Sequence, residues 1–236
     1  MGDSSSRRVP WARVLVEGLV IVVSILLAFG IDAGWGRYQD REDEREAIAQ
    51  LRVDFEANAA RLDTIRGMHE AALDAAYEFL ARAGMGGEPR SEASTAEVVY
   101  TSLRAWSYDP VLGGINSLVQ SGRLGLLRND SLRVAVAGWP DIVEDLSGDE
   151  LMEHRNTFEE WAPHLVSEGA MYDVLRAAGK IQRLDVEPAS DRSELLSDPV
   201  LVQWMSWRVN GLENVLPEIT TVEESIRRIL ELLESG

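Results

Sequence analysis

The sequence predicts an all-α protein with an N-terminal transmembrane helix, a long helix after it, and a helical-bundle domain that ends in a second long helix. Three observations predict this fold class. An apolar stretch lies near the N-terminus, two long segments repeat apolar residues at helical spacing, and no run of residues alternates as a half-buried strand does. We divide the 236 residues into a short basic tail (1–13), a transmembrane helix (14–33), a long juxtamembrane helix (34–84) and a helical domain that packs back on it (85–236).

The segment from Val14 to Ile31 is apolar except for Glu17 and Ser24. As a helix its 18 residues span ~27 Å, close to the ~30 Å thickness of the hydrocarbon layer of a bilayer. Aromatic rings that suit the two headgroup layers bracket the segment, and we expect them to act as membrane-interface anchors: Trp11, Trp35 and Tyr38. We therefore expect this segment to cross a lipid bilayer.

Two other interpretations of this segment fit part of the pattern. A cleaved signal peptide needs small residues at a processing site, but those near Ala28 lead directly into a charged helical run. A buried core helix fits the uncharged stretch from Gly18 to Ile31, which is only 14 residues long. The aromatic residues at both ends and the weak amphipathicity between them favour the transmembrane helix.

Glu17 is unusual because a carboxylate costs about 2.5–3.5 kcal/mol at the centre of a bilayer. One interpretation is that it reaches the headgroup layer or pairs with Arg13, one turn earlier. The other is that polar and small residues at helical spacing form a face on which identical helices pack: Glu17, Ser24, Ala28 and Asp32. This second interpretation predicts a homo-oligomer. An alternative function follows from it, a small ion channel with Glu17 and Asp32 as cation-attracting rings.

The charge and composition of the chain indicate its orientation in the membrane and the classes of partner that we expect. A short tail with Arg7 and Arg8 before an uncleaved apolar helix is the usual signal-anchor arrangement. We expect a single-pass protein of a bacterial inner membrane, with a cytoplasmic N-terminus and the helical domain outside. Equal numbers of Arg on the two sides of the span leave the reversed topology as the alternative.

A formal net charge of −17 argues against binding nucleic acid. The expected partners are the lipid bilayer, further copies of the chain and an unidentified protein.

From residue 37 to residue 83 the sequence predicts one long helix, because it lacks Pro and is rich in Ala, Glu, Arg and Leu. Asn58 and His69 fall in its apolar seam, where we expect polar residues that set the register of packing. The other seam residues recur at coiled-coil spacing, first Ile48, Leu51, Phe55, Leu62 and Ile65, then Ala72, Ala76 and Phe79.

A Gly-rich loop at 84–91 is followed by shorter helices, which we predict at 95–107, 112–121, 130–145 and 149–178. Pro140 and Pro163 are expected to kink or interrupt the last two of these. The second long helix is predicted at 199–234, kinked at Pro217. Its seam is Met205, Leu212, Val215, Ile219, Val222, Ile226, Ile229 and Leu233. We expect the two long helices to pack antiparallel.

No catalytic motif stands out, and we expect neither an enzyme nor a cofactor. Zero Cys excludes thiol catalysis and Cys-ligated metals. One candidate metal site is a helical face with Asp149, Glu150, Glu153 and His154. A di-metal bundle would need Glu-x-x-His motifs on two helices, which the chain lacks, so we expect no metal.

Two segments, EGLVIVVSILLAFGIDA (Glu17 to Ala33) and SLVQSGRLGLLRNDSLRVAVAGW (Ser117 to Trp139), carry a family resemblance. The chain resembles a bacterial family of uncharacterised single-pass membrane proteins, known as a domain of unknown function. In that family an acidic residue opens the span and a charged helix follows. Gly34 and Gly36 depart from the polar residues and second aromatic that many relatives carry there. The resemblance implies a membrane-tethered helical protein and no activity.

Overall fold

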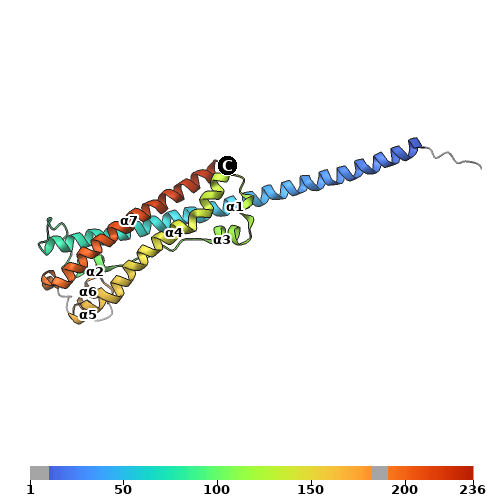
Figure 1. The fold of residues 1–236 in the computed structure, drawn as a ribbon. Coiled ribbons are helices and arrows are strands. Elements are labelled where there is room, and N and C mark those ends of the chain that lie inside the picture. Colours follow the sequence, from blue (N-terminus) through green and yellow to red (C-terminus); the bar gives the residue numbers. More distant parts are fainter. Residues whose placement is uncertain (1–10, 182–190, 236) are drawn as a thin grey trace, which may run out of the picture. The chain divides into compact units, whose positions relative to one another are not determined.

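The structure, a computed structural model, describes residues 11–181 and 191–235, with side chains from residue 16 onward. Within these ranges the chain is helical and contains no strand, which confirms the predicted all-α fold class. The α-helices are α1 (Trp11–Arg82), α2 (Thr95–Leu103), α3 (Gly113–Gln120), α4 (Asp130–Arg155), α5 (Ala162–Ser167), α6 (Met171–Ala177) and α7 (Pro199–Glu234) (Figure 1). Two 3₁₀ turns, η1 (Arg123–Leu126) and η3 (Ser193–Ser197), and a π-helical segment, η2 (Asn156–Trp161), complete the list.

The chain divides into two compact units, unit 1 (Met1–Ala49) and unit 2 (Gln50–Gly236). The helix α1 contributes to both, so the predicted transmembrane and juxtamembrane helices are parts of one uninterrupted helix. Most of the predicted basic tail (1–13) lies outside the described residues.

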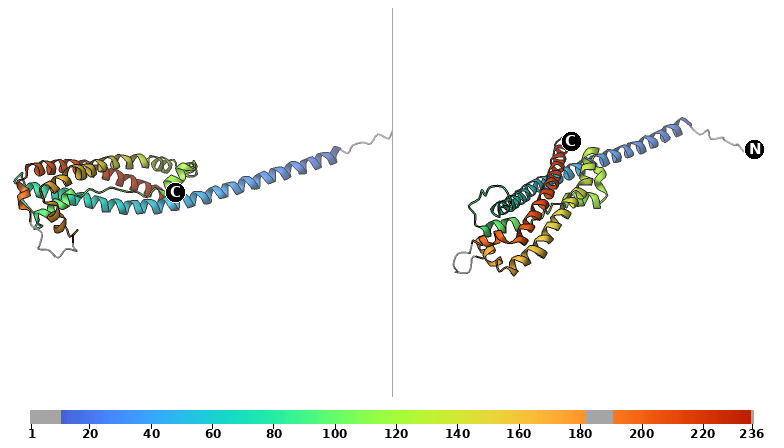
Figure 2. Two further views of the ribbon diagram at one scale, coloured as in Figure 1. Left: turned by 90° about the horizontal axis from the view of Figure 1, so that it is seen from below. Right: turned by 60° about the vertical axis from the view of Figure 1, so that its left-hand side comes forward.

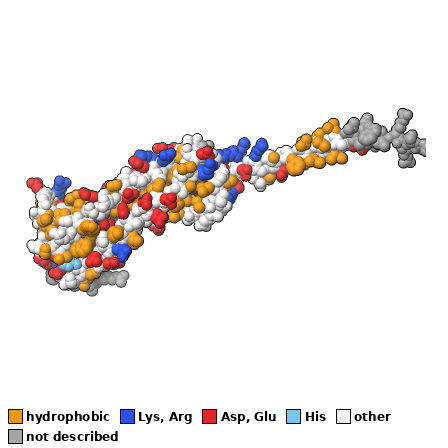
Figure 3. Space-filling model, viewed as in Figure 1, with side chains coloured by type: hydrophobic (Ala, Val, Ile, Leu, Met, Phe, Trp, Pro, Cys, Tyr) orange, Lys and Arg blue, Asp and Glu red, His pale blue; other side chains and the backbone are white. Residues whose placement is uncertain are grey.

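Unit 1 is one exposed helix in its described part. From Val16 onward α1 is long and apolar enough to cross a membrane, a property that signal sequences share, and none of its apolar stretch is buried. Figure 3, which shows one face, draws hydrophobic side chains in orange along this part of α1. Large side chains on every side of the helix are exposed, among them Leu19, Val22, Leu26, Phe29 and Ile31.

Unit 2 is built on three long helices, the second part of α1, α4 and α7. Three contacts show that α7 is antiparallel to α1, as predicted, because the numbering falls on one helix as it rises on the other. They are Arg52 Nη2 to Leu233 O at 2.9 Å, Arg66 Nη2 to Glu223 Oε2 at 2.6 Å, and Tyr77 Oη to Glu213 Oε1 at 2.5 Å. Figures 1 and 2 show the two helices side by side in opposite directions.

The helix α4 runs in the same direction as α1 and packs against both long partners. Phe55 meets Trp139 edge-on, with ring centroids 5.1 Å apart, and further along His69 meets Glu150. The core between the helices contains all eight predicted seam residues of α7. Burial of these apolar faces is the main stabilisation of such a bundle, at ~25 cal/mol per Å² of apolar surface.

All the short elements except α3 and η1 cover the end of the bundle where α7 begins. Apolar residues from α2, η2, α5, α6 and η3 join the C-terminal part of α1 and the first turns of α7 in one core cluster. Its largest members include Phe79, Trp161 and Met205. This cluster fixes the segments that surround the sites described below.

Several predicted helix boundaries were wrong, for tertiary reasons. The helix predicted at 95–107 ends at Leu103, because its last carbonyls bond a side chain of α7 rather than the next turn. The helix predicted at 130–145 continues to Arg155 through Pro140, held by burial of Trp139 and Val143 on either side of the proline.

The helix predicted at 149–178 is divided into separate elements. A π-helical turn, η2, precedes Pro163, and π turns commonly absorb an irregularity of this kind. The helix α5 then ends at Ser167, and Gly169, whose φ is +66°, lets the chain reverse into α6. In α7 the predicted bounds are reproduced, and Pro217 lies inside the helix.

Candidate functional site

Polar side chains meet in the interior of unit 2, between α1, α4 and the segment that joins α2 to α3. His69 Nε2 lies 3.2 Å from Glu150 Oε1, and the two side chains are 0% and 1% exposed. The other carboxylate oxygen of Glu150 accepts a hydrogen bond of 2.7 Å from the Tyr108 backbone N–H. Burial raises the pKa of the Tyr108 hydroxyl, and the charge of Glu150 adds to this rise against the opposing effect of Arg61. Glu150 therefore joins α4 both to α1 and to the connecting segment.

Two further residues of α1 hold the same connecting segment. The buried Asn58 amide donates to Val111 O at 3.0 Å and accepts from Val111 N–H at 2.6 Å. Asp54 Oδ2 accepts the Gly114 N–H at 2.6 Å and so supplies the cap that the start of α3 lacks in its own sequence. A Cβ at Gly114 would lie 2.8 Å from that oxygen, so the approach requires glycine.

A buried ion pair joins α4 to α7. Arg208 is 0% exposed and pairs with Glu153. Its Nε donates to Ser102 O at 2.9 Å and its Nη2 to Arg104 O at 2.6 Å, so the guanidinium also closes the C-terminal end of α2. Burial lowers the pKa of Arg208, and the charge and hydrogen bond of Glu153 oppose that shift. One side chain thus holds three helices together.

Gly211, one turn after Arg208, makes room for the ion pair. A Cβ at this position would meet the Glu153 carboxylate at well under the 3.0 Å that real Cβ contacts respect. Movement of the Glu153 carboxylate away from Arg208 would cost free energy, because it would leave a buried charge without a partner. The close approach of α4 and α7 at this level requires glycine.

Most polar groups of this interior bind one another or backbone groups, but the buried Nδ1 of His69 has no hydrogen-bond partner among the described residues. The four residues of the candidate metal face do not converge, because Glu150 and Glu153 point into the core whereas Asp149 and His154 are exposed. Among the described residues no group of three His or acidic side chains is placed to hold a metal ion. The arrangement joins α1 to α4 through His69 and Glu150, and α4 to α7 through Glu153 and Arg208.

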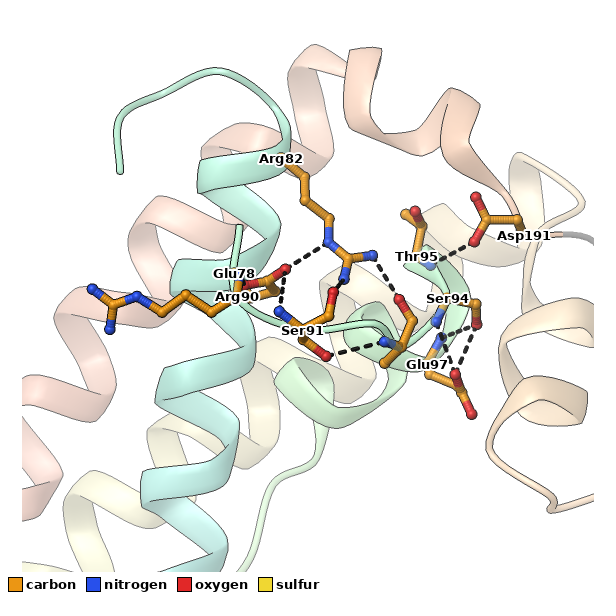
Figure 4. A network of polar contacts seen from close by, with 9 residues as sticks. Glu78, Arg82, Arg90, Ser91, Ser94, Thr95, Glu97 and Asp191 are labelled. Carbon is orange, nitrogen blue, oxygen red and sulfur yellow. Dashed lines mark hydrogen bonds and ion pairs between the residues drawn. The ribbon is translucent and has the colours of Figure 1, made fainter. Parts of the chain in front are cut away.

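A second polar network fastens the Gly-rich loop to the end of α1 (Figure 4). Glu78 Oε1 lies 2.7 Å from Arg82 Nε, and Glu78 Oε2 accepts the Arg90 N–H at 2.7 Å. Arg82 in turn donates to Ser91 O at 2.6 Å and to Ala93 O at 2.8 Å. Burial by itself raises the pKa of Glu78, but hydrogen bonds from Arg90, Arg82 and Ser91 outweigh it and hold the pKa below its usual value.

Low pH is expected to weaken the attachment of the Gly-rich loop to α1. Because the pKa of Glu78 is lower in the folded chain than its ordinary value of 4.5, its contribution to stability is complete above that value and is lost as the pH falls through the folded pKa. We expect the unfolding temperature to drop between about pH 5 and about pH 3 more steeply in the wild type than in Glu78→Gln. Circular dichroism melts at several pH values measure this. An exposed carboxylate on α7 provides the control, Glu231→Gln, which should follow the wild type; equal slopes for Glu78→Gln and the wild type would contradict the assignment.

The residues predicted to form the membrane and oligomer face all lie on α1 in unit 1 and are exposed: Glu17, Ser24, Ala28 and Asp32. The Ser24 hydroxyl donates to Val20 O at 2.8 Å, which satisfies it without a partner helix. Of the predicted interface anchors, Trp35 and Tyr38 are exposed, with ring centroids 5.9 Å apart, and the side chain of Trp11 lies outside the described part.

The predicted seam of the long helix is divided between core and surface. Leu51, Phe55 and Leu62 are buried in unit 2, Ile65 is half-buried there, and Ile48 is half-buried in unit 1. The three buried residues, Leu51, Phe55 and Leu62, pack inside one chain, so a second copy has no access to them.

The sequence patterns described above did not identify Arg208, which forms the buried ion pair with Glu153. A signal was present, because Arg208 lies three residues after Met205 and four before Leu212, in the middle of the apolar seam of α7. A charge at such a position needs a buried partner. The identity of that partner, Glu153 on α4, required the tertiary structure.

Comparisons with protein-family models, with curated protein sequences and with solved structures found no match to this chain. The family resemblance of the two segments described above therefore stays an expectation, and the function is argued from the chain itself.

Proposed function

We propose that this chain is a membrane-anchored, non-enzymatic helical protein in which unit 2 is an interaction or sensor module. The observation that carries the proposal is the exposed apolar surface of α1, where large side chains such as Leu26 (64%) and Phe29 (68%) are open to the surroundings. Water-soluble proteins rarely expose contiguous apolar surface on this scale. A lipid bilayer would cover all sides of the helix at once, as a single protein partner would not.

The proposal includes a bacterial inner membrane, with the N-terminus in the cytoplasm. Arg7 and Arg8 before the apolar segment support this orientation. It also includes self-association. Because Leu51, Phe55 and Leu62 are occupied within unit 2, contacts between copies would use the face of Glu17, Ser24, Ala28 and Asp32.

The test is membrane fractionation of the full chain expressed in a bacterium. We expect the wild type to stay with membranes through an alkaline wash and to keep its N-terminus. The double variant Val22→Arg/Leu26→Arg should move to the soluble fraction, since each arginine near the centre of the span costs about 2.5–3.5 kcal/mol. In the same preparation, cross-linking should yield oligomers in the wild type and several-fold fewer in Ala28→Ile, which adds bulk to the small-residue face.

Two matched control variants introduce arginines outside the apolar segment, or added bulk outside the proposed oligomer face. Val134→Arg/Leu151→Arg alters apolar residues of unit 2 that are 72% and 58% exposed, and it should leave fractionation unchanged. Val22→Ile adds bulk on a side of α1 that does not contain Ala28 and should leave cross-linking unchanged. A wild-type chain that is soluble, or that has lost its apolar segment by cleavage, would overturn the membrane anchor. Cross-linking that is equally strong in Ala28→Ile would overturn the oligomer face.

A further inference from the structure

A pocket of about 310 Å³ opens in unit 2 between α2, η2, α5 and α6. Its floor consists of core side chains, Leu103, Leu165 and Val174, which are at most 8% exposed. Phe158 and Met171 line it further, and Phe158 is 57% exposed. The volume lies at the lower end of the range of small-molecule sites, about 300–1,000 Å³. An alkyl chain of about ten carbons fits this volume, at the ~30 Å³ that a water-sized group occupies in a liquid.

One cation lines this pocket, and a second lies near the ring of a lining residue. Arg104 lines the pocket, with its guanidinium carbon 3.8 Å from the centre of the Trp106 ring and 5.6 Å from that of Tyr100. Lys180 is not a lining residue, but its Nζ lies 5.8 Å from the centre of the Tyr100 ring, and Tyr100 lines the pocket. Aromatic rings hold both cations by cation–π attraction, which leaves their hydrogen-bond donors available.

Among the described residues, these two cations lack the carboxylate partner that several other cations of the chain have. Acidic residues outnumber Lys and Arg by 40 to 23, so a carboxylate partner is abundant for almost any cation. Arg66, Arg82, Arg192 and Arg208 each have one. Within residues 11–181 and 191–235, no ion pair joins Arg104 or Lys180 to an acidic side chain.

We propose that this pocket binds an amphipathic carboxylate, a medium-chain fatty acid whose alkyl chain fills the apolar floor and whose carboxylate pairs with Arg104 and Lys180. The planar guanidinium of Arg104 matches a carboxylate in a two-point hydrogen bond. The backbone of Arg104 is already fixed, because its carbonyl accepts from Arg208. The head of the ligand would therefore meet a preorganised group, and its tail would cover Phe158 and Met171. This site goes beyond the proposed function and does not depend on where α1 lies.

Equilibrium dialysis of radiolabelled decanoate against the full chain in lipid nanodiscs tests the proposal, with empty nanodiscs of the same lipid as the blank. We expect one saturable site per chain above the blank. Arg104→Gln should weaken binding at least tenfold, because it removes the charge-assisted hydrogen bonds and keeps the backbone carbonyl that Arg208 binds. Lys180→Gln, at an exposed position, should weaken it several-fold, and Met171→Trp should abolish it by filling the pocket.

The control is Arg155→Gln, which removes an exposed arginine paired to Glu159 outside the pocket and should bind decanoate like the wild type. Decanol should bind at least tenfold more weakly than decanoate. No saturable binding above the blank would overturn the proposal. So would equal binding of decanol, which would show a neutral apolar occupant, or unchanged affinity in both Arg104→Gln and Lys180→Gln. Should Arg104→Gln fail to fold, Lys180→Gln and the decanol comparison decide the result.

Discussion

Replacing Arg208 by leucine is expected to lower the free energy of unfolding of unit 2 by about 3–5 kcal/mol. The substitution strands the Glu153 carboxylate, which is 5% exposed, and removes the donors that bind Ser102 O and Arg104 O. A buried charge without a partner is among the largest single destabilising effects. Urea unfolding of the full chain in mild detergent, followed by circular dichroism, measures the loss.

Two controls separate burial from charge in this experiment. Arg227→Leu removes one side of an exposed pair with Glu224, in which the side chains are 68% and 65% exposed, and should change stability by no more than about 1 kcal/mol. Arg208→Met combined with Glu153→Met removes both charges and should recover part of the loss. A single Arg208→Leu variant as stable as the wild type would contradict the buried ion pair.

Replacing Gly211 by alanine should also destabilise unit 2, by about 2–4 kcal/mol, although alanine normally favours a helix over glycine by about 1 kcal/mol. The added methyl group would displace the Glu153 carboxylate from Arg208, because its carbon would lie less than 3.0 Å from three atoms of that carboxylate. The same urea titration measures this effect, and a fall in the urea midpoint with an unchanged slope is expected.

Whether Gly211→Ala lowers or raises the free energy of unfolding tests directly whether the added methyl group clashes with Glu153. Gly148→Ala lies on an exposed turn of α4, where a Cβ would meet no atom within 4 Å, and should stabilise by about 0.5–1 kcal/mol. In a background of Glu153→Ala with Arg208→Met, Gly211→Ala should likewise become neutral or stabilising, since the carboxylate is gone. If Gly211→Ala destabilises equally in both backgrounds, the clash with Glu153 is not its cause.

The long elements could be predicted because their signals are repeated many times along the chain. Eight apolar residues recur at helical spacing on α7, and its predicted bounds, 199–234, are those of the structure. An error at any one position leaves such a pattern intact. Short elements lack this redundancy. The end of α2 at Leu103 is decided by the Arg208 side chain, more than a hundred residues away, which no local pattern contains.

The candidate sites also have some features that the local sequence predicts and others that depend on tertiary contacts. The apolar surface of α1 could be predicted from the sequence, because the ability of a helix to span a bilayer depends on the length and composition of a single segment. Asn58 and His69 could be recognised as polar residues in an apolar seam, but their partners Val111 and Glu150 could not. The pocket beside Arg104 combines residues from four elements, and its existence depends on how the chain reverses at Gly169 between α5 and α6.

The sequence by itself determined that the chain is all-helical, that its first helix carries an apolar surface long enough for a bilayer, and that two long seams pack antiparallel. These properties follow from periodicity and composition, which are local. Only the tertiary structure decided which charges are buried together, which glycines are required and where a pocket remains. Pairing, close approach and empty space are relations between residues distant in the chain, and they exist only once the helices have packed.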